Sequence, residues 1–148
     1  MSRQEERFAE AGRLSQLLIA IAEEAKGDFM DTVGAFGLPV PLARVLVLLS
    51  TPAPMRDLAD QMRCDRSYIT SLADQLEERG LITRIPGTDR RVKLLTLTED
   101  GVGLRDKISA AVAERNMILR RLTDDERRTL APLLERLRGD EPDAACTE

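Results

Sequence analysis

Residues 55–98 read MRDLADQMRCDRSYITSLADQLEERGLITRIPGTDRRVKLLTLT, and this stretch decides the fold. Apolar residues at helical spacing predict two short helices, over about 55–62 and about 66–79. Only Arg63-Cys64-Asp65 separates them. Two helices joined by so brief a turn are typical of a helix-turn-helix. Six apolar side chains supply its small interior: Leu58, Ala59, Met62, Ile69, Leu72 and Leu76.

The pattern changes from helical to strand-like after Gly80. This glycine is placed to end the second helix, and Asp65 is placed to cap its start. Two β-rich runs, 81–85 and 92–98, then flank the polar turn 86–91, which predicts a β-hairpin with a basic tip. A hairpin directly after a helix-turn-helix is the plan of a winged helix.

Helical patterns precede this region. Apolar residues recur every three or four positions from residue 8 to 36, which predicts one long helix that ends near Gly37. A helix of this length suggests packing against a partner chain, and a long intramolecular helix is the alternative. A shorter helix over about 41–49 is apolar on nearly every side, so we expect it in the centre of the fold.

Two helices are also expected after the hairpin. Thr98 caps one that runs to about Arg121, and a capping box at Thr123–Glu126 opens the other. Pro132 should kink the second helix or split it in two. The fold class is thus mainly α with a small β-hairpin wing, and the acidic residues 139–148 predict a disordered tail.

Composition narrows the classes of function. The chain of 148 residues is 43% apolar and 32% charged, which describes one soluble domain. Its apolar runs are too short to cross a membrane and no secretory signal is visible, so we expect a cytoplasmic protein. With no histidine and only scattered carboxylates, we expect neither an enzyme nor a metal or other cofactor. Cys64 and Cys146 are isolated and form no disulfide framework or zinc motif.

Polar side chains on the second short helix are candidates for DNA contact. They occupy its N-terminal turns, opposite the apolar Ile69, Leu72 and Leu76, and such a helix can enter a major groove. The candidates are Arg66, Ser67, Tyr68, Thr70 and Ser71. Among them Arg66 or Ser67 is the expected base reader, whereas Tyr68 is a candidate for a phosphate contact. The alternative is an ordinary solvated helix face.

The hairpin tip is the second candidate surface. The net charge of the chain is −4, yet between Arg84 and Lys93 four basic residues stand against Asp89 alone. Arg90 and Arg91 follow Asp89 on the turn, where one guanidinium can reach a narrow minor groove while the carboxylate fixes another. The alternative is a solvated hairpin tip. Two further basic residues are weaker candidates for phosphate contact: Arg56 and Lys93.

These segments resemble, in order and spacing, the MarR family of bacterial transcription regulators. The resemblance covers residues 8–138, and three segments carry it: Asp57-Leu58-Ala59 through Gly80-Leu81-Ile82, Asp89-Arg90-Arg91, and Leu97-Thr98-Glu99-Asp100-Gly101. It implies a single domain over 1–138, in which 8–37 and 99–138 are dimerisation helices and 41–98 is the DNA-binding winged helix. It also implies that Arg91 enters a minor groove and that Asp89 holds the wing in shape.

Two residues depart from the family's pattern. Arg63 stands where the family often has glycine, so it is strained if the backbone there is left-handed. Cys64 replaces a small aliphatic residue and is expected to be a buried small hydrophobe, with redox sensing as the lesser alternative. The histidines of zinc-sensing members and the N-terminal cysteine of peroxide-sensing members are missing. The resemblance therefore implies a small organic effector or none.

The resemblance also implies where an effector would bind. The family's cleft lies between the dimerisation helices and the winged helix, and Phe29, Phe36 and Leu42 would line it here, although the same residues are core by default. The combined prediction is a homodimeric repressor that binds double-stranded DNA at a pseudo-palindrome and is released by an effector. A winged-helix protein-interaction module without DNA binding is the alternative.

Overall fold

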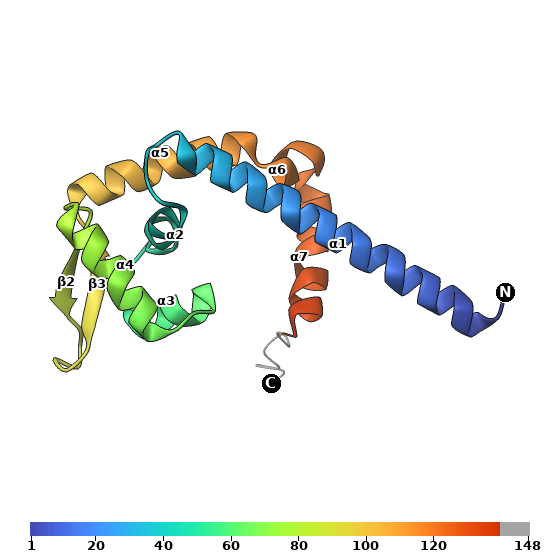
Figure 1. Ribbon diagram of the computed structural model, residues 1–148, viewed down its shortest axis with the longest axis horizontal. Coiled ribbons are helices and arrows are strands. Elements are labelled where there is room, and N and C mark those ends of the chain that lie inside the picture. The colour runs from blue at the N-terminus through green and yellow to red at the C-terminus, as the bar shows by residue number, and fades with distance from the viewer. Residues whose placement is uncertain (140–148) are drawn as a thin grey trace.

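Two long helices run along one edge of the molecule, and a smaller unit with the sheet lies beneath one end of them (Figure 1). This computed structural model describes residues 1–139 of the 148. The elements in chain order are α1 (Arg3–Gly34), α2 (Val40–Leu48), β1 (Ala53–Pro54), α3 (Met55–Met62), α4 (Arg66–Glu78), β2 (Ile82–Pro86), β3 (Lys93–Leu97), α5 (Glu99–Arg115), α6 (Met117–Arg121) and α7 (Asp124–Arg138). The tail predicted over 139–148 lies outside the described residues, except for Gly139.

The predicted helix-turn-helix is confirmed. α3 and α4 begin at the expected residues, and Gly80 follows α4 with a left-handed φ of +72°. Arg63 has φ 51° and ψ 50°, so the turn is left-handed at a residue with a side chain, and this conformation is strained. Asp65 occupies the N-cap position of α4, but its side chain makes no capping hydrogen bond.

The sheet is antiparallel with the strand order β1-β3-β2. β2 and β3 form the predicted hairpin, in which Ile82 lies opposite Leu97 and Arg84 opposite Leu95. β1 was not predicted, because its two residues lie in the Pro-rich break after α2 and become a strand only by pairing with β3. β3 is thus the central strand and is hydrogen-bonded to a neighbour on each side.

The core fills the winged-helix half and extends under α5. α2 buries four of its nine residues, so its central position is confirmed. The largest fully buried side chains come from several elements: Val33, Leu42, Val45, Leu46, Leu49, Leu58, Ile69, Leu76, Ile82, Leu95 and Ile108. Cys64 packs against this core but is only half-buried, so it is less enclosed than expected.

The C-terminal helices correct one prediction and exclude one of the two alternatives of another. α5 ends at Arg115, because Asn116 has an extended backbone (φ −66°, ψ 121°) and its Oδ1 accepts the N–H groups of Ile118 and Leu119, which begins α6. α7 is one continuous helix although Pro132 lies inside it, so the proline does not split it.

The helix caps follow the sequence. The capping box between Thr123 and Glu126 is formed, and the hydrogen bonds from Thr123, chiefly from its backbone N–H, lower the pKa of Glu126. α1 starts several residues earlier than expected, because Ser2 and Glu5 form a second capping box. Within residues 1–139, no helix combines the length and the apolar character that a membrane span needs.

Candidate nucleic-acid interface

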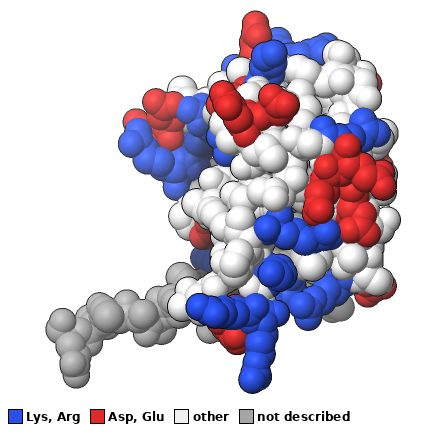
Figure 2. All heavy atoms as spheres, turned by 90° about the vertical axis from the view of Figure 1, so that its left-hand side faces the viewer, with Lys and Arg blue, Asp and Glu red and all other residues white. Residues whose placement is uncertain are grey.

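The end of the molecule that carries the winged helix has an uneven distribution of charge. Figure 2 looks onto this end: Lys and Arg side chains dominate its lower edge, at the height of the hairpin tip in Figure 1, whereas higher up Asp and Glu side chains lie among further Lys and Arg side chains. A DNA duplex is polyanionic, so the lower edge is the part of this face that attracts it.

α4 presents its polar residues to solvent because its apolar residues are buried. Ile69, Leu72 and Leu76 are all at most 3% exposed and fix the rotation of the helix. Four of the five polar candidates are consequently exposed, namely Arg66, Ser67, Tyr68 and Ser71. These four form an open polar surface on the first turns of α4.

Thr70 differs from the other candidates on α4. It is half-buried, and its hydroxyl lies 3.1 Å from the carbonyl oxygen of Arg66 and 3.5 Å from the sulfur of Met55. A hydroxyl has one proton to donate, and both acceptors within reach of the Thr70 hydroxyl are atoms of the protein itself. The structure therefore turns Thr70 toward α3 and its own helix.

The hairpin tip is shaped by its own hydrogen bonds. The Asp89 carboxylate accepts the backbone N–H of Arg91 at 3.0 Å, and the Asp89 carbonyl accepts the N–H of Val92 at 3.0 Å. The N–H of Gly87 donates to the Val92 carbonyl at 2.8 Å and closes the turn. Arg90 and Arg91 are exposed on it. The tip is an ordered loop that offers two guanidinium groups to solvent.

The two weaker candidates belong to neither the first turns of α4 nor the turn of the hairpin. Arg56 is exposed at the start of α3, with its Nε 3.7 Å from Asp57. Lys93 is exposed at the first residue of β3. Neither position restrains its side chain strongly, and both can follow a nearby phosphate.

Arg84 is a functional candidate that the sequence reasoning counted only as part of a basic run. Its Nη2 lies 2.7 Å from Asp74 Oδ1 and its Nη1 lies 2.8 Å from Glu77 Oε2. The hydrogen bond to Asp74 is the main cause that raises the pKa of Arg84 above its ordinary value. A sequence signal existed, because Asp74 and Glu77 are three residues apart and so share one face of α4.

The start of α5 is fastened to the end of α4. The Thr98 hydroxyl donates to the Gly80 carbonyl at 2.6 Å and accepts the N–H of Gly101, while the Thr98 N–H donates to the Leu81 carbonyl. A Cβ on Gly101 would lie 1.9 Å from the Leu81 carbonyl oxygen, so only glycine fits. This junction links α5 directly to the winged helix.

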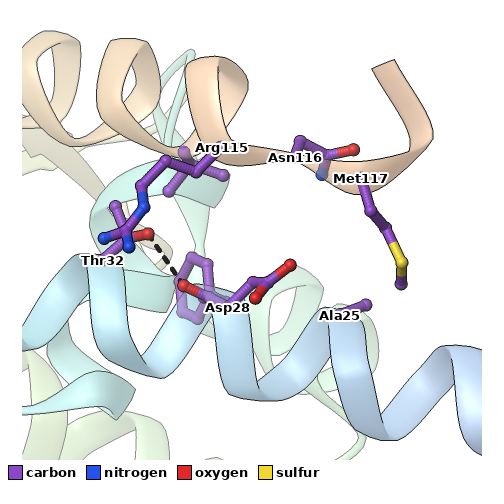
Figure 3. Close-up of a pocket in the computed structure, with 8 residues that line it drawn as sticks. Ala25, Asp28, Thr32, Arg115, Asn116 and Met117 are labelled. Atoms are coloured by element: carbon purple, nitrogen blue, oxygen red, sulfur yellow. Dashed lines mark hydrogen bonds between the residues drawn. The ribbon is translucent and has the colours of Figure 1, made fainter. Parts of the chain in front are cut away.

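A pocket of about 160 Å³ opens where α5 gives way to α6 (Figure 3). The hydroxyl of Thr32 donates to the Asp28 carbonyl at 2.8 Å along one wall. Eight residues of α1, α5, α6 and the α5–α6 break line it: Ala25, Asp28, Phe29, Thr32, Val112, Arg115, Asn116 and Met117. Nearby, Arg121 bonds Glu24 at 2.8 Å and lowers the pKa of that carboxyl.

The structure separates the three effector candidates. Phe29 lines this pocket. Phe36 is half-buried against the core, and Leu42 is fully buried within it. The pocket is lined by no residue between 40 and 98, so it belongs to the long helices. Within the described residues, no group of three or more Cys, Asp or Glu side chains is arranged to hold a metal ion.

Comparison with known proteins places these features in context. The sequence profile of the MarR family matches residues 40–93. A Thauera aromatica protein, described as a transcriptional regulatory protein for the hcr operon, is 45% identical over 82 residues, which are 54% of this chain and 49% of that protein. The chain therefore spans about half the length of this relative.

Two solved structures are similar over most of the chain. A MarR-family transcriptional regulator from Rhodococcus sp. RHA1 is 30% identical, with a TM-score of 0.71 over 86% of this chain and 93% of that one. CouR from Rhodococcus jostii RHA1, solved with bound p-coumaroyl-CoA, is 29% identical, with a TM-score of 0.76 over 91% of this chain and 95% of that one.

Proposed function

The chain belongs to the MarR family of transcriptional regulators, and from this premise we propose that it acts as a homodimer on a pseudo-palindromic DNA site. In each protomer, residues 41–98 bind DNA, and 8–37 and 99–138 form the dimer within one domain over 1–138. The two α4 helices enter successive major grooves, about one helical turn apart, and the wings enter the flanking minor grooves.

The open polar start of α4 beside an ordered arginine tip is the observation that carries this proposal. Arg66 or Ser67 reads base edges in the major groove, Tyr68 and Ser71 contact the backbone, and Thr70 supports the helix from behind. At the wing, Arg91 reaches the minor groove, Arg90 contacts phosphate and Asp89 maintains the turn. Exposure and side-chain chemistry support the roles on α4, and the resemblance to the MarR family supports those of Arg91 and Asp89.

Exposed apolar side chains on the long helices support the dimer. α1 carries several that are 40% or more exposed, and its N-terminal half projects beyond the rest of the molecule (Figure 1). The exposed apolar side chains of α1, α6 and α7 are Phe8, Leu14, Leu17, Leu18, Ile19, Ile21, Met30, Ile118, Leu119, Leu133, Leu134 and Leu137. A soluble monomer rarely exposes so many, and a second copy of the chain would cover them.

A dimer that covers a promoter excludes polymerase, so we infer repression in the cytoplasm. The bound p-coumaroyl-CoA of CouR supports release by a small organic effector here. The pocket that Phe29 lines is the open site for it, and Phe36 and Leu42 are reached only if the core opens. An effector that prefers a dimer with wrongly spaced α4 helices would shift the population away from DNA.

Replacing Arg91 tests this function. A 40-bp duplex is first selected by the wild-type protein from a randomised library, and binding is then measured by fluorescence anisotropy over a salt series. We expect affinity to fall steeply with salt. Arg91→Ala should weaken binding by about 1–3 kcal/mol. Arg7→Ala, which removes the same charge from the far end of α1, should bind like the wild type.

Two results would contradict the proposal. If the wild-type protein selects no duplex even in dilute salt, the chain is a protein-interaction module rather than a DNA-binding regulator. If Arg91→Ala and Arg7→Ala bind equally well, Arg91 makes no contact with DNA and its proposed role in the minor groove is wrong.

A further inference from the structure

Arg84 lies at a position of the sheet where an apolar side chain is expected. Side chains alternate along a strand, so Arg84 shares a face with Ile82, and it lies opposite Leu95 on β3. Both of these neighbours are at most 2% exposed, and they face the helices. The stem of Arg84 therefore runs along the edge of the core, and its guanidinium reaches out to the rim.

Two carboxylates of α4 receive this guanidinium. Each terminal nitrogen donates to a different acid, Nη2 to Asp74 at 2.7 Å and Nη1 to Glu77 at 2.8 Å. The Arg84 side chain is 28% exposed, and those of Asp74 and Glu77 are 59% and 45% exposed, so the carboxylates are open to water and the geometry of the contact matters more than its strength. A planar guanidinium can hold two acceptors in fixed directions, which a lysine ammonium cannot. The arrangement fixes β2 against α4.

The guanidinium of Arg84 is consequently paired with carboxylates of the protein itself. The exposed DNA-facing candidates are on the first turns of α4 and at the hairpin tip, whereas Asp74 and Glu77 are on the later turns of α4. Arg84 thus sits between the two DNA-facing surfaces and contacts the helix that carries one of them.

We propose that Arg84 is a positioning residue for DNA binding, whose contacts with Asp74 and Glu77 set the wing relative to α4. The inference rests on the proposed function. β2 continues from Arg84 to Pro86, a reach of roughly 7 Å along the strand, and the turn over 87–92 extends the tip beyond it, so a tilt of about 10° moves the tip by at least about 1 Å. A minor groove is only about 6 Å wide, so a displaced tip brings Arg91 into it less well aligned and weakens the contact.

Neutralising the two acids tests the inference by the sign of the effect. Asp74→Asn combined with Glu77→Gln removes two negative charges near the DNA, so charge alone predicts tighter binding. Loss of the positioning contact predicts the opposite, and we expect binding of the selected 40-bp duplex to weaken about fivefold. The matched control is Asp60→Asn combined with Glu78→Gln, two exposed acids on α3 and α4 that no hydrogen bond ties to Arg84. The control should bind as tightly as the wild type or slightly more tightly.

A double-mutant cycle then shows whether the effect passes through the wing. In an Arg91→Ala background the same pair, Asp74→Asn with Glu77→Gln, should change affinity less than about twofold, because the minor-groove contact that depends most on the tilt of the wing is already lost. Arg84→Lys should also weaken binding although it keeps the charge. Circular dichroism of each variant checks that it is folded at the temperature of the assay.

The outcomes are distinct. If the Asp74 and Glu77 pair binds as tightly as its control, or if Arg84→Lys binds like the wild type, Arg84 acts only through its charge and the inference is wrong. Equal losses with and without Arg91 would also overturn it, because they indicate a general loss of structure. Failure of the wild type to select DNA, or of Arg91→Ala to weaken binding, instead contradicts the proposed function.

Discussion

The winged-helix half and the long helices bury their apolar residues to very different extents. α2 buries four of nine residues, whereas α1 buries two of thirty-two and α7 buries none. The contrast does not come from a lack of apolar side chains, because α1 carries them from Phe8 to Val33 and α7 carries four leucines. The winged-helix half completes its own core, and the long helices present apolar surface that another molecule must cover.

The two halves meet at α5. Ile108 in the middle of this helix is fully buried in the core, and Gly101 at its start lies against the Leu81 carbonyl. The same helix ends at the pocket near Asn116. α5 is therefore the element through which the long helices and the winged helix share contacts.

The largest expected effect comes from a charge placed on the exposed apolar surface of α1. Leu18→Glu should raise the dissociation constant of the dimer by about 100-fold, or about 3 kcal/mol, because an unpaired carboxylate would be buried between the two copies. Analytical ultracentrifugation over a concentration series measures this constant. Gln16→Glu, two residues away and on the opposite side of the same helix, is the matched control.

The result decides whether the contrast between the halves reflects dimerisation. A Leu18→Glu protein that sediments like Gln16→Glu would mean that this face of α1 lies outside the interface. The apolar surface of α1 would then need another explanation.

A smaller effect is expected at the junction between the halves. Gly101→Ala should destabilise the protein by about 1–3 kcal/mol, because the new methyl group overlaps a backbone carbonyl that cannot swing aside. Gly103→Ala, two residues further along the same helix, meets open space and should stabilise it by about 0.5–1 kcal/mol. Urea unfolding at one protein concentration compares the two. Similar stabilities would show that the close approach of α5 and Leu81 carries no weight.

Local signals explain why the winged helix was predictable. The brief turn before Asp65, the glycine after α4 and the change to β-rich runs each act over a few residues, so the sequence alone contains them. Asp65 shows the limit of such signals, because it occupies the cap position without making the capping bond. The sequence predicts where the chain turns better than it predicts which atoms bond there.

The features that were missed depend on distant pairing or on competing local bonds. β1 exists only because β3 lies beside it. The break at Asn116 is hidden by the apolar residues Ile108, Ile118 and Leu122, which keep helical spacing across it. Pro132 interrupts no helix because the carbonyl of Arg128, four residues earlier, is on an exposed helix where water can satisfy it.

The residues of the candidate site likewise divide into those with a local sequence signal and those whose role depends on distant parts of the chain. Exposure of Arg66, Ser67 and Arg91 follows from helix periodicity and from the position of the turn, both of which the sequence carries. The partners of Arg84 do not follow, because they depend on the angle at which β2 packs against α4. Effector candidates were the least predictable, since an apolar stripe does not distinguish the lining of a pocket from the core.

The smallest expected effect lies within the self-contained half, at the left-handed turn. Arg63→Gly should stabilise the protein by about 0.5–1 kcal/mol, because glycine adopts a φ of 51° without the strain that a Cβ brings. Arg79→Gly is the matched control: Arg79 ends α4 as Arg63 ends α3, but its φ is −80°, so glycine there should lower stability. Urea unfolding gives both values, and ultracentrifugation should find the dimer unchanged in each. If both glycine variants lose stability equally, the turn at Arg63 is not strained.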